Sequence, residues 1–216
     1  GITIKMAPVR MYYQTKAGET YQLNLIDTPG HVDFAYEVSR SLAAVEGVLL
    51  LVDVTQGVQA QTLAHYQKAK DQELAIIPVL NKVDLAGGDA EAVMLEMMDM
   101  FGFSEDEFVK VSAKTGLGID HLLDTIIERL PPPKAKAEEP LRALVFNSMF
   151  DAHKGVITHI RVKEGEVRAK MPLKLMVSKT QFEPFEVGIF APTMKPIEAL
   201  YPGEVGYLAT GLKNIR

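Results

Sequence analysis

Cysteine is absent from the 216 residues of this sequence. A chain without cysteine has no disulfide framework, no zinc ribbon and no catalytic thiol, which is consistent with a reducing compartment. Long apolar runs are lacking as well. The longest, at residues 47–52, has the length of a strand and is far short of the roughly 20 residues that a helix needs to span a bilayer. These residues therefore predict neither a disulfide-stabilised scaffold nor a membrane-spanning helix.

Charge is distributed unevenly along the chain. Residues 1–130 carry 10 basic and 19 acidic side chains, whereas residues 141–216 carry 11 basic and 7 acidic ones. Any contact with an RNA backbone is therefore expected in the C-terminal third, because phosphates attract Lys and Arg. The alternative, which charge by itself favours, is that these cations lie on solvated strand faces. Hydrophobic residues make up 47% of the chain, enough to bury the core of one or two domains.

The clearest domain boundary is a proline-rich linker at residues 131–140, where three successive prolines stop any preceding helix. Before the linker, strand patterns alternate with helix patterns. Strands are predicted at residues 21–26, 47–54, 76–80 and 108–111, and helices at residues 59–72, 90–100 and 118–130. This alternation predicts a doubly wound α/β domain with a mainly parallel sheet over residues 1–130. Met94, Met97 and Met98 fall at helical spacing and are predicted to lie in its core.

After the linker the pattern changes. Residues 156–162, 173–177 and 204–209 alternate in the manner of strands, with short turns between them, and no helix-length amphipathic segment remains. A chain of short strands and turns is typical of a small closed or two-layered β fold. The sequence therefore predicts a small β-barrel over residues 141–216, with a β-sandwich as the alternative.

Polar residues gather where three of the predicted strands end. Residues 27–31 read Asp-Thr-Pro-Gly-His, residues 81–84 read Asn-Lys-Val-Asp, and residues 112–114 read Ser-Ala-Lys. In an open α/β sheet, ligands bind at the carboxyl ends of the strands. Each cluster alone is a common turn sequence, but three in this order, each at the end of a strand, indicate a ligand site.

These clusters resemble the later motifs of the translational GTPases. Residues 26–34, Ile-Asp-Thr-Pro-Gly-His-Val-Asp-Phe, are close to diagnostic of that group, and residues 1–4 resemble the end of its first switch loop. Within the group the similarity is greatest to the elongation factor 4 branch, with elongation factor G as the alternative. It rests on residues 36–44, 57–64, 150–151 with 155–156, 203–207 and 211–213. The resemblance implies a P-loop-type GTPase domain that binds GTP or GDP with Mg²⁺, followed by a β-barrel domain.

The resemblance implies that the second and third clusters read the base of the nucleotide. The ring N–H and the exocyclic amine of guanine lie side by side, and one ionised carboxylate can accept from both. Adenine presents an acceptor and no amine there. Asp84 would therefore be satisfied by guanine and left unpaired by adenine, a mismatch that discriminates by roughly 10⁴-fold.

The other members of these two clusters would hold the base in place. Asn81 is expected to tie the loop together and to reach the base. The stems of Lys82 and Lys114 would cover its two faces, burying methylene groups while each ammonium stays in water. Ala113 would donate its backbone N–H to the base oxygen, and Ser112 would brace the loop. The alternative is an ordinary set of turns between strands and helices.

At the phosphate end, the resemblance assigns Mg²⁺ to Asp27, through water, and to the hydroxyl of Thr3. The Gly30 N–H would meet the γ-phosphate, because a residue without a Cβ atom allows close approach. His31 would position the attacking water, which suffices because phosphoryl transfer needs placement more than covalent chemistry. Without the resemblance, Thr3 would be a frayed end and His31 a surface or helix-capping residue.

One family motif is missing: the phosphate loop G-x-x-x-x-G-K-[ST] does not occur in these 216 residues. In the family it precedes the switch threonine, so we expect the chain to begin inside the GTPase domain and to end before the second domain is complete. GTPase activity is therefore expected of the full-length protein and not of residues 1–216 alone, because the β- and γ-phosphates lack their main cradle. A start codon directly upstream would instead indicate a non-catalytic remnant that docks on RNA or protein.

By resemblance, the full-length protein is a GTP-hydrolysing, ribosome-binding translation factor, and members of the elongation factor 4 branch can back-translocate tRNAs on the elongating ribosome. The implied partners are ribosomal RNA, ribosomal proteins and the tRNA-bearing elongation complex. The implied location is the cytoplasm, with peripheral association at the inner face of the cell membrane as a further expectation from the family.

Overall fold

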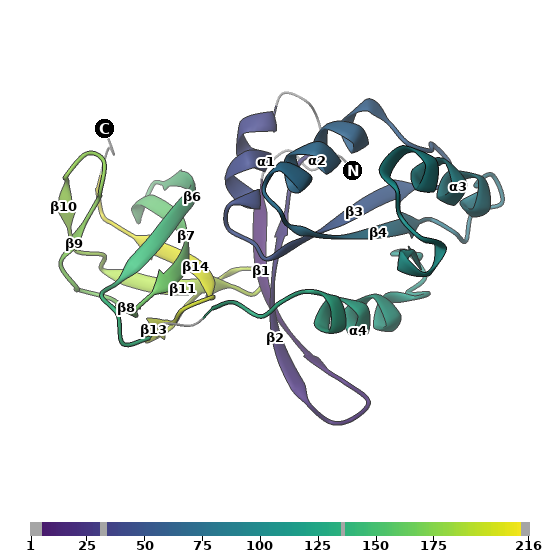
Figure 1. The fold of residues 1–216 in the computed structure, drawn as a ribbon. Coiled ribbons are helices and arrows are strands. Elements are labelled where there is room, and N and C mark those ends of the chain that lie inside the picture. The colour runs from purple at the N-terminus through teal and green to yellow at the C-terminus, as the bar shows by residue number, and fades with distance from the viewer. Residues whose placement is uncertain (1–5, 31–33, 135–136, 213–216) are drawn as a thin grey trace. The chain divides into compact units, whose positions relative to one another are not determined.

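The computed structural model describes residues 6–30, 34–134 and 137–212 (Figure 1). Its contacts divide the described residues into two compact units. The parallel-sheet unit contains Gly30 and residues 45–132. The antiparallel unit contains residues 6–29, residues 34–44 and the described residues from 133 onward. Each unit has its own hydrophobic core and is described by itself below.

The parallel-sheet unit has three strands in the order β3-β4-β5, and they run parallel. Its strands are β3 (Gly47–Asp53), β4 (Ala75–Asn81) and β5 (Val109–Lys110), and its helices are α2 (Ala60–Asp71), α3 (Ala90–Phe101), the short η2 (Glu105–Glu107) and α4 (Ile119–Arg129). These elements confirm the predicted alternation of strands and helices to within a few residues at each end.

Side chains on the two faces of this sheet meet different helices. Leu50 and Leu80 belong to a cluster with residues of α2 and α3, whereas Ile77 and Val79 belong to a cluster with Leu122 of α4. Figure 1 shows α4 on the opposite side of the sheet from α2 and α3. Helices on both faces explain the uninterrupted apolar run of β4, since both faces of this central strand meet a packed layer.

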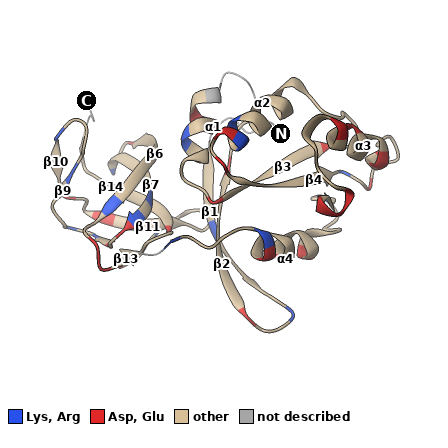
Figure 2. Ribbon diagram, viewed as in Figure 1, with Lys and Arg blue, Asp and Glu red and all other residues tan. Residues whose placement is uncertain are grey.

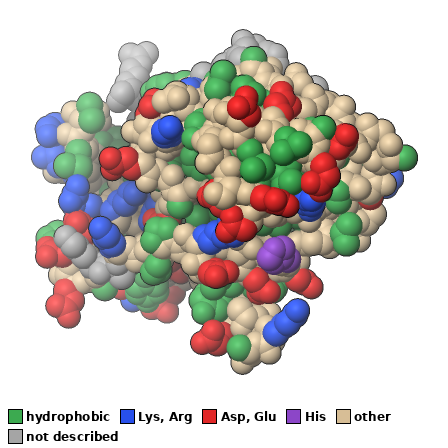
Figure 3. Space-filling model, turned by 45° about the vertical axis from the view of Figure 1, so that its right-hand side comes forward, with side chains coloured by type: hydrophobic (Ala, Val, Ile, Leu, Met, Phe, Trp, Pro, Cys, Tyr) green, Lys and Arg blue, Asp and Glu red, His purple; other side chains and the backbone are tan. Residues whose placement is uncertain are grey.

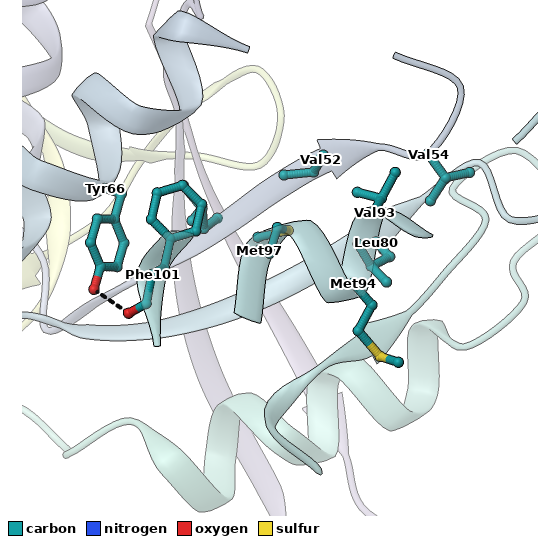
Figure 4. Packing of buried hydrophobic residues seen from close by; sticks show 9 residues of the cluster. Val52, Val54, Tyr66, Leu80, Val93, Met94, Met97 and Phe101 are labelled. Carbon is teal, nitrogen blue, oxygen red and sulfur yellow. Dashed lines mark hydrogen bonds between the residues drawn. The ribbon is translucent and has the colours of Figure 1, made fainter. Parts of the chain in front are cut away.

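The larger of these two clusters is shown in Figure 4. Met97 is fully buried, Met94 is buried and Met98 packs against the cluster from its edge, so the prediction that the three methionines lie in the core is confirmed. The buried Tyr66 hydroxyl donates to the Phe101 carbonyl oxygen at 2.9 Å, which satisfies the one polar group that this tyrosine brings into the core.

The described residues of the antiparallel unit include an N-terminal hairpin, a helix and a large sheet. The hairpin pairs β1 (Ala7–Gln14) with β2 (Thr20–Asp27), and the helix is α1 (Ala35–Leu42). The large sheet has the order β12-β11-β14-β7-β6. Its strands are β6 (Arg142–Asp151), β7 (Gly155–Glu164), β11 (Glu186–Phe190), β12 (Met194–Pro196) and β14 (Val205–Ala209), beside the pairs β8 (Val167–Arg168) with β13 (Ala199–Leu200) and β9 (Leu173–Lys174) with β10 (Gln181–Phe182).

The predicted barrel is only partly matched by this unit. Its strands are short and antiparallel, as predicted, and no helix follows the linker among the described residues. However, β6 and β12 lie at the two edges of an open sheet, and the described strands do not close into a ring. The remaining strands, β8, β9, β10 and β13, have two residues each and pair only with one another, which is too little to join the two edges.

Two polar contacts and a small core hold the N-terminal segments in the antiparallel unit. Arg161 on β7 donates to the Ala44 carbonyl oxygen at 2.8 Å, and Lys163 donates to that of Ala43 at 3.2 Å. These carbonyls follow α1, at the negative end of its dipole, where cations are stabilising. Met6 and Ala44 also pack with Phe146 and Val205. The antiparallel unit therefore includes these N-terminal segments as well as the residues after the linker. The domain boundary at residues 131–140 remains a prediction.

Charges differ between the elements of the two units. Helix α3 carries acidic and no basic residues, whereas β7 carries Arg161, Lys163 and Glu164. Figure 2 shows acidic positions on α3 and basic positions on β7. Acidic side chains also recur over the face of the molecule shown in Figure 3. None of the helices in the described part of the chain is long and apolar enough to cross a membrane.

Candidate functional site

The carboxyl ends of the parallel strands meet at one edge of the sheet. Asp53, the last residue of β3, is the register partner of Asn81, the last residue of β4. Val111, directly after β5, joins β4 and the loop that follows it through backbone hydrogen bonds: the Val111 N–H donates to the Leu80 carbonyl of β4 at 2.8 Å, and the Val83 N–H donates to the Val111 carbonyl at 3.3 Å. The second and third polar clusters are thereby brought together, as the sequence predicts.

Between these two loops lies a hollow of about 340 Å³, within the size range of small-molecule sites. The residues that line it are Asn81, Lys82, Asp84, Leu85, Ser112, Ala113 and Lys114. All six residues that the sequence assigns to the base of a nucleotide are among them. Asp84, Ala113 and Lys114 are exposed, so a ligand can reach them from solvent.

Asn81 ties the two loops together. Its side-chain oxygen accepts a hydrogen bond from the Ala113 backbone N–H at 3.1 Å. The expected loop-tying role of Asn81 is therefore present in the geometry. The same contact shows that the Ala113 N–H, which we expected to face a base oxygen, already donates to Asn81 in this structure.

Ser112 is fully buried and braces the second loop, as expected. Its hydroxyl oxygen accepts from the Thr115 N–H at 3.2 Å, and its backbone carbonyl accepts from the Gly116 N–H at 2.9 Å. The loop ends at Gly118, where φ is +73° and a Cβ atom would lie 2.2 Å from the Lys110 carbonyl oxygen. Only glycine fits there, so the turn that presents Ser112, Ala113 and Lys114 has a specific backbone requirement.

Lys82 makes an ion pair that the sequence does not predict. Its ammonium lies 2.5 Å from Oδ2 of Asp53, whose Oδ1 accepts from the hydroxyl of Thr55 at 2.7 Å and from its N–H at 2.9 Å. Burial tends to raise the pKa of Asp53, but the hydrogen bonds from Lys82 and Thr55 outweigh it and hold the pKa below its ordinary value. The feature of the sequence that could have indicated this ion pair is the position of Asp53 at the end of a predicted strand.

A comparison with known protein families agrees with the three polar clusters and their order. The model of the Elongation factor Tu GTP binding domain matches residues 1–132 of this chain. The chain belongs to that family. The match covers both the parallel-sheet unit and the hairpin, and it confirms the predicted resemblance to translational GTPases. The hollow at the ends of β4 and β5 is thus part of a GTP-binding domain.

Curated relatives point to one branch. The chain is 52% identical to "Elongation factor 4" of Syntrophomonas wolfei over 215 residues, which is 100% of this chain and 36% of that protein. It is 49% identical to "Elongation factor 4" of Thermotoga maritima over 215 residues, 100% of this chain and 35% of that protein. These names confirm the predicted similarity to elongation factor 4. The chain spans about a third of the length of the curated relatives it matches.

Of the residues that the resemblance assigns to the phosphates and Mg²⁺, Asp27 is the last residue of β2 and is exposed. Gly30 is described, and its carbonyl oxygen lies 3.3 Å from Nε2 of His65 on α2. Thr3 and His31 lie outside the described residues. Within residues 6–30, 34–134 and 137–212, no group of three or more His, Asp or Glu side chains could hold a metal ion.

Mg²⁺ remains compatible with the residues present. Unlike Ca²⁺, it is usually held by one or two carboxylates together with phosphate oxygens and water, and does not need a cage of protein ligands. A single carboxylate such as Asp27, joined by a hydroxyl such as Thr3, fits that chemistry. The donor set therefore agrees with a metal that arrives with a nucleotide.

Proposed function

We propose that this chain forms the base-reading part of a GTP-hydrolysing, ribosome-binding translation factor of the elongation factor 4 type. One observation carries the proposal: Asn81, Asp84 and residues 112–114, separated in sequence, line one hollow at the carboxyl ends of β4 and β5. The family match and the names of the relatives support the same assignment.

Guanine would be selected at the exposed carboxylate of Asp84. An ionised carboxylate only accepts hydrogen bonds, and guanine offers two adjacent donors where adenine offers none. The stems of Lys82 and Lys114 would pack against the faces of the base. Asn81 and Ser112 would act through the loops that they hold, since both already make hydrogen bonds within the site.

The phosphate end completes the proposal. Asp27 and Thr3 would hold Mg²⁺, which supplies charge neutralisation to the phosphate oxygens when bound. The Gly30 N–H would contact the γ-phosphate. His31 would orient the water that attacks the γ-phosphorus, with GDP and inorganic phosphate as the products.

The partners follow from the same assignment. We propose that the protein binds the ribosome, through rRNA and ribosomal proteins, and acts on the tRNA-bearing elongation complex in the cytoplasm by back-translocating tRNAs. The antiparallel unit, with its net basic sequence, is the part whose charge suits contact with RNA. Residues 141–216 would correspond to the second domain of the factor. Nothing in the fold or the relatives supports the peripheral membrane association.

Competition between nucleotides tests the base-reading site. With the protein expressed from its complete coding sequence and a fluorescent GDP derivative bound, unlabelled GDP should displace the probe at least roughly 10³-fold better than ADP, because only guanine satisfies Asp84. Equal displacement by GDP and ADP would show that the hollow does not read guanine. Failure of the probe to bind at all would favour a protein that docks on RNA without nucleotide.

The proposed role of His31 leads to a separate prediction. In the full-length protein, His31→Ala should leave GTP affinity within about twofold and slow ribosome-stimulated hydrolysis by about 10²-fold, as for other positioned catalytic groups. Equilibrium binding and single-turnover phosphate release measure the two effects. His121→Ala, a change of the same kind on α4, is the control and should alter neither quantity. A parallel loss of affinity and turnover in His31→Ala would indicate a structural role.

A further inference from the structure

Lys82 is held at both ends of its side chain. At the backbone, its φ of +66° is one that L-residues rarely adopt, and the loop keeps it there because the Leu85 N–H donates to the Lys82 carbonyl at 3.1 Å. At the far end, its ammonium meets Asp53 at 2.5 Å. The stem between these two points lines the hollow with Asn81 and Asp84.

Asp53 is itself held in place by contacts other than the one with Lys82. Its side chain is only 19% exposed, and two hydrogen bonds from Thr55 orient one carboxylate oxygen so that the other faces the ammonium. The strands on which it depends are also joined at this point, because the Val54 N–H donates to the Asn81 carbonyl at 3.1 Å. The carboxylate is thus a rigid anchor, whereas Lys82 is flexible by nature.

We propose that Asp53 is a positioning residue for guanine binding: it anchors the ammonium of Lys82 so that the lysine stem stands ready as one wall of the base site. A free lysine loses rotamer entropy when its side chain is ordered. Here that ordering takes place when the protein folds, and less of it remains for the moment of binding. The inference rests on the proposed guanine site.

Three variants test the role of Asp53 in the full-length protein. Asp53→Asn should weaken GDP binding by about tenfold, because the Lys82 stem would no longer be ordered before the nucleotide binds. Guanosine should lose a similar factor, since this stem contacts the base and not the phosphates. Lys82→Met keeps an apolar stem but removes the ammonium. Asp71→Asn, an exposed carboxylate at the end of α2, removes the same charge outside the hollow and should bind GDP as the unmodified protein does.

The decisive measurement is a double-mutant cycle read by calorimetry. If Asp53 acts through Lys82, Asp53→Asn should cost nothing further in the Lys82→Met background. If the two losses multiply instead, Asp53 has a role of its own and the inference is wrong. Unchanged GDP affinity in Asp53→Asn would also overturn it while leaving guanine recognition intact, whereas failure of the unmodified protein to bind GDP would overturn the proposed function itself. Matching melting temperatures separate positioning from a general loss of fold.

Discussion

Replacing Asp84 by asparagine should weaken GDP binding by about 10³-fold and at the same time create a preference for xanthosine diphosphate. Asparagine places an NH₂ donor where the carboxylate had two acceptors. The exocyclic amine of guanine, a donor, would then face the NH₂ donor of asparagine. Xanthine presents a carbonyl oxygen at that position and accepts the new hydrogen bond. The change should be selective because Asp84 is exposed at the rim of the hollow and takes no part in the hydrophobic core.

Competition of GDP and xanthosine diphosphate against a labelled nucleotide measures this exchange of preference. Asp71→Asn serves as the matched control, since it makes the same chemical change at an exposed position outside the site. Reversal of the order of affinities in Asp84→Asn alone is the expected result. Weak binding of both nucleotides, with no reversal, would mean that the substitution disturbs the loop and that Asp84 does not read the base.

The stability of the antiparallel unit should fall by about 2 kcal/mol between pH 7 and pH 5 because of one buried histidine. His159 on β7 is only 3% exposed and lies between the rings of Phe146 and Phe190, with centroids 6.0 and 4.7 Å away. Neither of its ring nitrogens has a hydrogen-bond partner within the described part of the chain. Burial lowers its pKa to about 4 from the ordinary 6.5.

The sign of the pH dependence follows from which state of the chain, folded or unfolded, binds the proton at the higher pH. Between pH 6.5 and pH 4 the unfolded chain binds a proton at this imidazole and the folded chain does not. Its contribution to stability is therefore complete above pH 6.5 and is lost progressively as the pH falls toward 4, where the loss reaches about 3 kcal/mol.

Hydrogen exchange at the amides of β7 and β14 measures this effect within the antiparallel unit itself. In His159→Phe, which keeps an aromatic ring without the titrating group, protection at pH 5 relative to pH 7 should fall much less than in the unmodified protein. His153→Phe, at an exposed histidine of the same unit, should retain the full loss. An equal loss in His159→Phe would assign the pH dependence to other groups.

The elements of the parallel-sheet unit and the polar residues at its edge could be predicted from the sequence alone. The short apolar runs at β3 and β4 predict strands, although Leu51 of β3, at the edge of the sheet, is 57% exposed, and the helical spacing of Met94 and Met97 places them in the core. Since parallel strands end at the same edge, Asn81, Asp84 and Ser112 had to lie near one another. These conclusions depend only on periodicity and chain direction, which are local properties.

Which side chains meet across strands could not be predicted from the sequence and is seen in the folded chain. The pairing of Lys82 with Asp53 depends on the reach of a long side chain over a parallel register, which has no periodic signature. The alternation in β7 predicts that one face of the strand is exposed to solvent, yet residues 156–162 are all buried. Strands β6 and β14 flank β7, and Phe146 and Phe190 cover the face that carries His159. Similarly, closure of a sheet depends on the pairing of its edge strands. Such pairing joins segments far apart in the chain, and so a barrel was predicted where the structure has an open sheet.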